Sequence, residues 1–196
     1  MDRMIYTAMT GANAAAHRQQ LLANNLANAS TPGFRAELAT FRAVPVRGDG
    51  TTSRVFALEA SAGHSEVSGP VNTTGRSLDV AARDNAWFAV QGLDGTEAYT
   101  RGGAFEISAD GALVNAHGLP VLDDGGSPIS VPANAQLAFG ADGTLTARVG
   151  DQAPQRVAKL KLVTPNDDNC LKRIEDGLFR PVQGEALDAD ANARVQ

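Results

Sequence analysis

Cysteine is nearly missing from this chain of 196 residues, in which Cys170 is the only one. A single thiol excludes an intramolecular disulfide and any metal site built from several cysteines. A lone cysteine with no catalytic pattern around it is more often a loop or core residue than a nucleophile. Cysteine content therefore leaves the redox compartment undecided.

Long apolar runs and a cleavable secretion signal are missing as well. No stretch approaches the ~20 apolar residues that a membrane-spanning helix needs. The opening MDRMIYTAMTGANAAAH has no apolar core followed by a small-residue cleavage site. We expect no stable membrane insertion, and any destination outside the cytoplasm requires export without a cleaved signal.

Aromatic residues make up only 5% of the chain, and its basic residues do not cluster. Residues 1–47 carry a net charge of +3 and residues 48–196 carry −8, so a weakly basic arm precedes an acidic body. The basic residues of the arm are scattered along it: Arg3, Arg18, Arg35, Arg42 and Arg47. Without clustered cations or stacking aromatics, nucleic acid is not an expected partner.

The histidines and acidic residues form no pattern typical of a catalytic or metal site. His17 falls in an alanine-rich stretch, while His64 and His117 each have a glycine neighbour in turn-like sequence. The run that starts at Asp188 imitates a calcium loop, but Ala193 stands where a glycine is needed and no closing glutamate follows. We therefore expect no catalytic residue, no metal and no cofactor.

One long helix is predicted at the start of the chain. Residues 2–28 contain no proline and one glycine, and Asp2 is a plausible N-cap. An apolar seam follows alternating steps of three and four residues: Ile5, Ala8, Ala12, Ala15, Gln19, Leu22 and Leu26, widened by Met9 and Ala16. Its alanines bury little area but let another helix approach closely. We predict that the seam is an assembly interface, and that in this chain alone the helix is disordered or paired with another molecule instead of packing fully on its own β domain.

The remaining sequence favours a mainly β fold, with an antiparallel β domain joined to the helix through an extended linker that has short strands. Pro32 and Gly33 end the helical region. Asp110-Gly111 and Asp142-Gly143 share an Ala-Asp-Gly-X-Leu setting, which predicts two similar hairpin turns. The expected segments are the assembly helix at 1–33, the linker at 34–80, the β domain at 81–185 and an open C-terminal segment at 186–196.

The stretch 25–35, Asn-Leu-Ala-Asn-Ala-Ser-Thr-Pro-Gly-Phe-Arg, resembles the signature of flagellar rod and hook proteins. The matching positions are Asn25, Leu26, Ala27, Asn28, Thr31, Gly33, Phe34 and Arg35. The two asparagine amides can bond to helix-terminal carbonyls or to a neighbour's backbone. The glycine permits a tight exit from the helix, and the phenylalanine can anchor that exit by burial.

Two further blocks resemble the same family, so the resemblance covers the chain from its start to about residue 181. They are Arg76-Ser-Leu-Asp-Val-Ala ahead of Trp87-Phe88, and Tyr99-Thr-Arg-Gly-Gly-Ala-Phe. The opening residues and Arg42-Ala-Val-Pro-Val resemble the proximal-rod member of the family more than the distal-rod member.

Two departures from the family pattern lead to further expectations. The family usually has Gly-X-Gly before the aromatic strand, where this chain has Asp84-Asn85-Ala86, so that turn is expected to differ in shape. Rod proteins also carry a C-terminal helix that pairs with the first, and nothing after Leu187 supplies one. We therefore expect this chain to be a fragment.

The resemblance implies a structural axial subunit of the bacterial flagellar basal-body rod, which self-assembles, spans the periplasm and passes torque from motor to hook. Its implied partners are other rod subunits, proximal and distal, contacted through terminal helices, and the flagellar type III export apparatus. A distal-rod or hook protein is the alternative within the family. Outside it, the alternatives are a secreted β-domain binding module and a small hydrolase.

Overall fold

The computed structural model describes residues 3–45, 55–166, 168–174 and 177–196, and the chain divides into two compact units, Met1–Glu66 and Val67–Gln196. The expected mainly β fold with one N-terminal helix is confirmed. Helix α1 spans Arg3–Ala27. It ends in a turn where Thr31 N–H donates to the carbonyl of Asn28, directly before the proline. The proposed N-cap Asp2 lies outside the described residues.

The first unit also contains a β-hairpin that the sequence did not clearly indicate. Strand β1 (Glu37–Pro45) pairs antiparallel with β2 (Val55–His64), and a register shift lies near the start of β1. The segment expected to be a linker with short strands thus contains strands of nine and ten residues. A two-stranded ribbon with little buried surface lacks the clean apolar and polar alternation that normally reveals strands.

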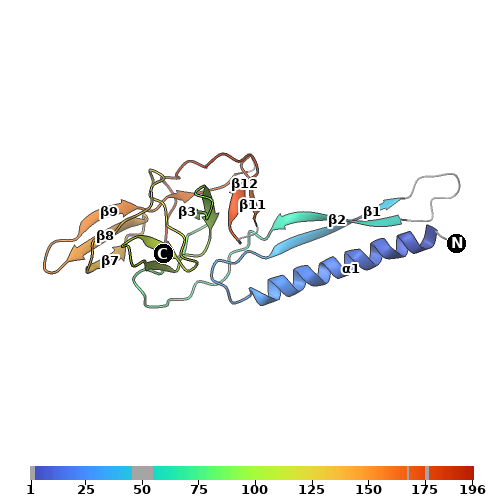
Figure 1. The fold of residues 1–196 in the computed structure, drawn as a ribbon, viewed down its shortest axis with the longest axis horizontal. Coiled ribbons are helices and arrows are strands. Elements are labelled where there is room, and N and C mark those ends of the chain that lie inside the picture. Colours follow the sequence, from blue (N-terminus) through green and yellow to red (C-terminus); the bar gives the residue numbers. More distant parts are fainter. Residues whose placement is uncertain (1–2, 46–54, 167, 175–176) are drawn as a thin grey trace. The chain divides into compact units, whose positions relative to one another are not determined.

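Helix α1 lies alongside this hairpin within the first unit (Figure 1). An isolated hairpin and an isolated helix of this length are both marginal in water, so each stabilises the other by packing. The sequence predicted a helix that is disordered or paired with another molecule instead of packing fully on the β domain, and in the structure α1 is ordered and packs on a hairpin of its own unit. Its partner is the hairpin that precedes the β domain.

The first unit nevertheless buries almost nothing. Among the side chains of residues 4–45, 55–58 and 63–66, only Arg35 is buried, with 6% of its surface exposed. Every buried apolar side chain of the described residues lies in the second unit. The first unit is thus a thin layer of secondary structure without an apolar core of its own.

The second unit consists of short antiparallel strands. The strands are β3 (Trp87–Gln91), β4 (Glu97–Thr100), β5 (Phe105–Ile107), β6 (Leu113–Asn115), β7 (Ala135–Phe139), β8 (Thr144–Val149), β9 (Gln155–Lys159), β10 (Leu162–Val163), β11 (Leu171–Arg173) and β12 (Phe179–Pro181). Among the described residues, they form a five-stranded sheet in the order β10-β3-β4-β12-β11, the pair β5-β6 and the three-stranded sheet β7-β8-β9.

Strand β3 separates two apolar clusters. Phe88 and Val90 point into the larger cluster, which also contains Phe105 and Leu145. Trp87 points into the smaller one, where its ring lies 4.6 Å from that of Phe179. Adjacent residues of a strand face opposite sides, so burial of both faces explains why β3 is apolar throughout.

The two Asp-Gly turns have the predicted geometry. Gly111 connects β5 to β6 and Gly143 connects β7 to β8, with φ of 78° and 79°. In each turn the glycine N–H donates to a carbonyl three residues earlier, at 3.0 Å. Positive φ is cheap only for glycine, so this residue fixes both turns.

The C-terminal residues are not an open segment, contrary to expectation. Leu187 and Val195 are buried, and Val195 forms a β-bridge with Ala82. Ala81 and Gln196 donate backbone hydrogen bonds to each other, at 2.7 and 2.9 Å. Leu187, Ala193 and Val195 face the core, so the low apolar content of residues 186–196 did not mean that the whole segment is exposed.

Candidate assembly surface

The predicted seam of α1 faces away from the hairpin. All of its members are exposed: Ile5, Ala8, Met9, Ala12, Ala15, Gln19, Leu22 and Leu26. The exposed fraction reaches 61% for Ile5 and 78% for Leu26. Met4 and Tyr6 add further exposed apolar surface to the first turn. Large exposed apolar side chains arranged along one helix face are typical of an interaction surface.

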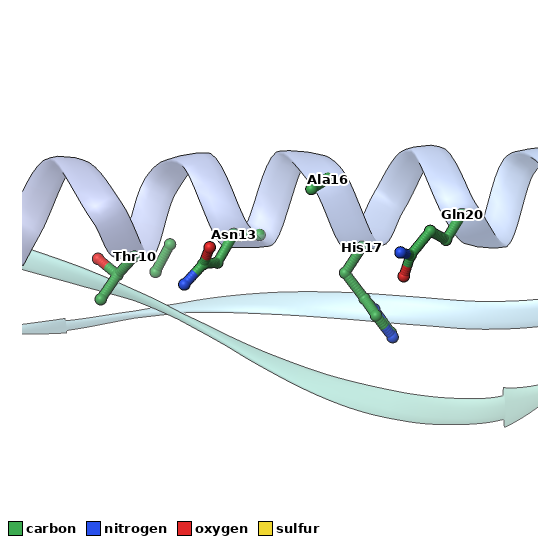
Figure 2. Close-up of a pocket in the computed structure, with 7 residues that line it drawn as sticks. Thr10, Asn13, Ala16, His17 and Gln20 are labelled. Carbon is green, nitrogen blue, oxygen red and sulfur yellow. The ribbon is translucent and has the colours of Figure 1, made fainter.

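A different stripe of the helix is turned toward the hairpin. Its partly buried members recur at helical spacing: Thr7, Thr10, Ala14, Leu21, Asn25 and Asn28. Figure 2 shows Thr10, Asn13 and His17 pointing from α1 toward the two strands. Together with Ala57 of β2 they line an open groove of about 480 Å³, in which polar side chains alternate with alanines. Apart from Leu21, the helix therefore places polar and small residues against its own chain, and its other large apolar side chains are exposed.

The hairpin contributes exposed apolar residues that the sequence did not single out. Leu38 and Phe41 of β1 and Val55 and Leu58 of β2 each expose between 42% and 53% of their surface. Strand assignment was needed to find them, because their spacing follows neither a helical nor a strict alternating pattern. They extend the exposed apolar surface of the first unit beyond α1.

The signature residues connect the end of α1 to the start of β1. The side-chain amide of Asn25 donates to the carbonyl of Glu37 at 3.0 Å, and its oxygen accepts the Glu37 N–H at 3.1 Å. Asn28 donates to the Asn24 carbonyl at 2.9 Å, as expected for an amide at a helix terminus. Asn25 was expected to bond to a helix end or a neighbouring molecule, and its partner is instead a strand of the same unit.

The exit from the helix is tight. Gly33 has φ of 76°, and Phe34 N–H donates to the carbonyl of Thr31 at 3.1 Å. Phe34 is half-buried, which supports its expected anchoring role only in part. Leu26, Ala27 and Thr31 are exposed. The signature thus combines residues that shape the turn with residues that face solvent.

Arg35 closes the signature as the buried cation of the first unit. Burial lowers its pKa, and the nearby carboxylate of Glu66 opposes that shift. Burial also lowers the pKa of His64. The negative charge of Glu66 opposes this shift, and the positive charge of Arg35 lowers the pKa further. These three side chains gather where β2 ends, opposite the start of β1. The cluster ties the two ends of the hairpin together electrostatically.

In the second unit the two other motif blocks lie against each other. The guanidinium of Arg101 donates to the carbonyls of Ala82, at 3.2 Å, and Ala86. Val80 N–H donates to the carbonyl of Gly103 at 2.9 Å. A Cβ on Gly103 would lie 1.8 Å from the Val80 oxygen, so only glycine fits there. The motif residues are therefore structural partners.

The turn at Asp84-Asn85-Ala86 keeps a conformation suited to glycine. Asp84 has φ of 49°, in the left-handed region that non-glycine residues rarely adopt. Arg101 holds the carbonyls on both sides of this turn. Aspartate tolerates the left-handed region better than most residues, so it can stand where the family pattern has a glycine.

The described residues offer no metal-binding group of three or more His, Cys, Asp or Glu side chains. The three histidines are far apart along the chain, and Cys170 is exposed. No helix within the described ranges is long and apolar enough to cross a membrane. The candidate functional site among the described residues is therefore the exposed apolar surface of the first unit rather than a catalytic or metal-binding pocket.

Comparison with known proteins gives two family matches. Residues 81–147 match the family described as "Flagellar hook protein FlgE/F/G D1 domain", and residues 5–35 match "Flagella basal body rod protein". The second match covers most of α1 and the whole signature. The first covers the block that starts at Tyr99 and both Asp-Gly turns, and it begins at Ala81, the last residue of the other block.

Individual relatives extend the similarity to the full chain. The flagellar basal-body rod protein FlgF of Salmonella typhimurium strain LT2 is 41% identical over 204 residues, which cover 100% of this chain and 80% of the relative. FlgF of Caulobacter vibrioides is 32% identical, covering 100% and 79%. FlgG of Bacillus subtilis is 28% identical, covering 98% and 78%.

A helix that ends in the rod signature, followed by a hook-type β domain, defines the class of flagellar rod and hook proteins. Within that class, the identity over the whole chain is higher to the FlgF relatives than to the FlgG relative. The chain belongs to the FlgF family of flagellar basal-body rod proteins. The resemblance inferred from the sequence is thereby confirmed.

Proposed function

We propose that the chain is a structural subunit of the flagellar basal-body rod that polymerises through the first unit. One observation carries this proposal: the first unit buries no apolar side chain among its described residues, while it exposes the seam of α1 and the apolar residues of the hairpin. Such a unit can gain its missing burial by packing against further helices in an assembly. At about 25 cal/mol per Å², apolar surface is a substantial driving force for that association.

The finer role follows from family and geometry together. The chain acts in the proximal part of the rod, contacts other rod subunits through α1, and passes torque from motor to hook without catalysis. It reaches the basal body, in the periplasm, through the flagellar export apparatus and without a cleaved signal. Alanines at the centre of the seam favour a helix as the partner, because small side chains let two helix axes come close.

The test places charge on the seam without touching the β domain. Ala12→Glu together with Ala15→Glu forces two carboxylates into the assembly interface, where burial without a partner is costly. Rod incorporation and swimming of cells that carry the altered gene should be lost. The melting temperature of the second unit should stay the same, because both positions are exposed in the free chain.

The matched control adds the same charge away from the seam. Asn13→Asp with Gln20→Glu introduces two nearly isosteric carboxylates on the groove side of α1. This variant should assemble and support swimming. If the seam variant also swims normally, or if it unfolds the second unit, α1 is not the polymerising element.

A further inference from the structure

We propose that residues 186–196 form a clasp that opens and closes without unfolding the rest of the second unit, and that the hydroxyl of Tyr99 holds it closed. The clasp belongs to none of the named strands of the unit, and Val195 forms a single bridge with Ala82. Its hydrogen bonds instead reach residues distant in the sequence, from Thr164 back to Ala81.

The inner fastening of the clasp is a buried chain of hydrogen bonds. Leu187 N–H donates to the Tyr99 hydroxyl at 2.7 Å, and that hydroxyl donates to a Glu97 oxygen at 2.7 Å. Lys161 pairs with the same carboxylate at 2.8 Å. The Tyr99 side chain is fully buried, and the Lys161 and Glu97 side chains expose only 10% and 14% of their surface. The hydroxyl thus uses its donor and an acceptor site at once.

Further hydrogen bonds hold the clasp along its length. The Thr164 hydroxyl donates to the Asp190 carboxylate at 2.7 Å, and Asp190 N–H donates to the Leu162 carbonyl at 2.7 Å. Near the end of the chain, Val195 N–H donates to the Ala141 carbonyl at 3.0 Å. Water competes for the exposed bond between Thr164 and Asp190, so that bond contributes less than the buried one at Tyr99.

Burial explains why the clasp opens separately. Only Leu187, Ala193 and Val195 of its side chains are buried, and Asp190 is half-buried. An element with few buried apolar contacts and exposed hydrogen bonds opens at a lower free energy than the core around it. Removing the clasp leaves both apolar clusters with most of their members, because Phe88, Val90, Trp87 and Phe179 lie elsewhere.

Tyr99 is the positioning residue because its hydroxyl bonds both to Leu187 of the clasp and to Glu97 of the sheet, so removing the hydroxyl breaks both bonds. Tyr99→Phe keeps the ring that fills the smaller cluster but leaves the Leu187 N–H without its buried partner. It also removes one donor from the buried Glu97 carboxylate. A buried polar group that loses its partner costs more than the bond itself was worth.

Hydrogen exchange of the whole chain, followed at increasing sub-denaturing urea, tests the proposal. The amides of Leu187, Asp190 and Val195 should exchange faster than those of Ala89 and Leu122, and their rates should hardly depend on urea, because local opening exposes little surface. Trypsin should cut the clasp after Arg194 before it cuts the sheets.

Tyr99→Phe should increase both the exchange of Leu187 and cleavage after Arg194 by about tenfold or more, with exchange at Leu187 still insensitive to urea. Tyr6→Phe, at the other tyrosine of the chain, should change neither. If Leu187 exchanges in the native chain at the same rate and urea dependence as Ala89, the clasp does not open on its own. If Tyr99→Phe leaves exchange and cleavage unchanged, its hydroxyl does not hold the clasp.

Discussion

Asn25 pairs its side-chain amide with both backbone polar groups of Glu37, twelve residues further along the chain. The side chain of Asn25, which lies in the last turn of α1, thus bonds to Glu37 in the way that the backbone of a neighbouring strand would. The signature of rod proteins therefore has a structural meaning within one subunit: it fixes where the hairpin starts relative to the helix.

Replacing Asn25 with alanine should loosen the start of the hairpin. Each of the two partly buried bonds that are lost contributes about 1 kcal/mol, so protection of the Glu37 amide from hydrogen exchange should fall by roughly thirtyfold. The matched control is Gln20→Ala on the same helix. Unchanged exchange at Glu37 would show that the paired amide contributes nothing to hairpin stability.

Gly103→Ala should destabilise the second unit strongly. The added Cβ would lie 1.8 Å from the backbone oxygen of Val80, and backbone cannot move aside as a flexible side chain can. The expected loss is at least about 2 kcal/mol of unfolding free energy, measured by urea denaturation. Gly69→Ala is the control, because that glycine has open space around it and no positive φ, and it should change stability little.

Asp84→Gly should make the second unit more stable. Relief of the left-handed conformation is worth about 1–2 kcal/mol, and the greater freedom of glycine in the unfolded chain takes back about half of that. A net gain of about 0.5–1 kcal/mol should appear as a higher urea midpoint. Asp84→Val should shift the midpoint downward, because a β-branched residue fits φ of 49° poorly. A loss of stability in the glycine variant would contradict the strain argument.

Acid sensitivity should depend partly on Asp94. Arg180 donates to its carboxylate at 2.7 Å, and Thr96 donates through its hydroxyl at 2.8 Å and its N–H at 3.1 Å. These bonds, that of Arg180 first, hold the pKa of Asp94 well below its ordinary value of 3.8. The ionised form therefore favours the folded state, and its contribution is complete above that ordinary value and is lost as the pH falls below it.

Asp94→Asn should flatten the fall in stability between about pH 4 and pH 2, and Arg180→Gln should do the same. Urea midpoints across this range provide the measurement. Part of the acid sensitivity should remain, because hydrogen bonds also lower the pKa of Asp142 and Asp190. If the urea midpoint falls as steeply with decreasing pH in both variants as in the unaltered chain, the Asp94–Arg180 pair does not cause the acid sensitivity.

The helix and its end were predictable because local chemistry determines them. A stretch without proline propagates as a helix, and Pro32 with Gly33 ends it close to where α1 stops at Ala27. Spacing also identified the apolar face of the helix, whose residues are exposed, and its role as an assembly interface stays a prediction. The Asp-Gly turns belong to the same group, since positive φ at Gly111 and Gly143 is a property of the residue itself.

The hairpin and the clasp could not be predicted in the same way. Strand β1 has no strongly buried face, so its stability depends on α1 and on Asn25 rather than on its own pattern. Leu187 and Val195 are too sparse to signal a buried segment, and their partners are distant in the sequence. Tertiary contacts determine the structure of both the hairpin and the clasp, and these contacts cannot be read from the local sequence pattern.

The reciprocal hydrogen bonds between Ala81 and Gln196 have a consequence for protein engineering. Because the first and last paired residues of the β domain are neighbours, the domain can be transplanted as a cassette into a surface loop of an unrelated host without stretching either junction. Equally, the residues between Ala81 and Gln196 can be exchanged for the corresponding residues of a related protein. The adjacent backbone hydrogen bond from Arg83 N–H to the Arg194 carbonyl extends the pairing of the two ends.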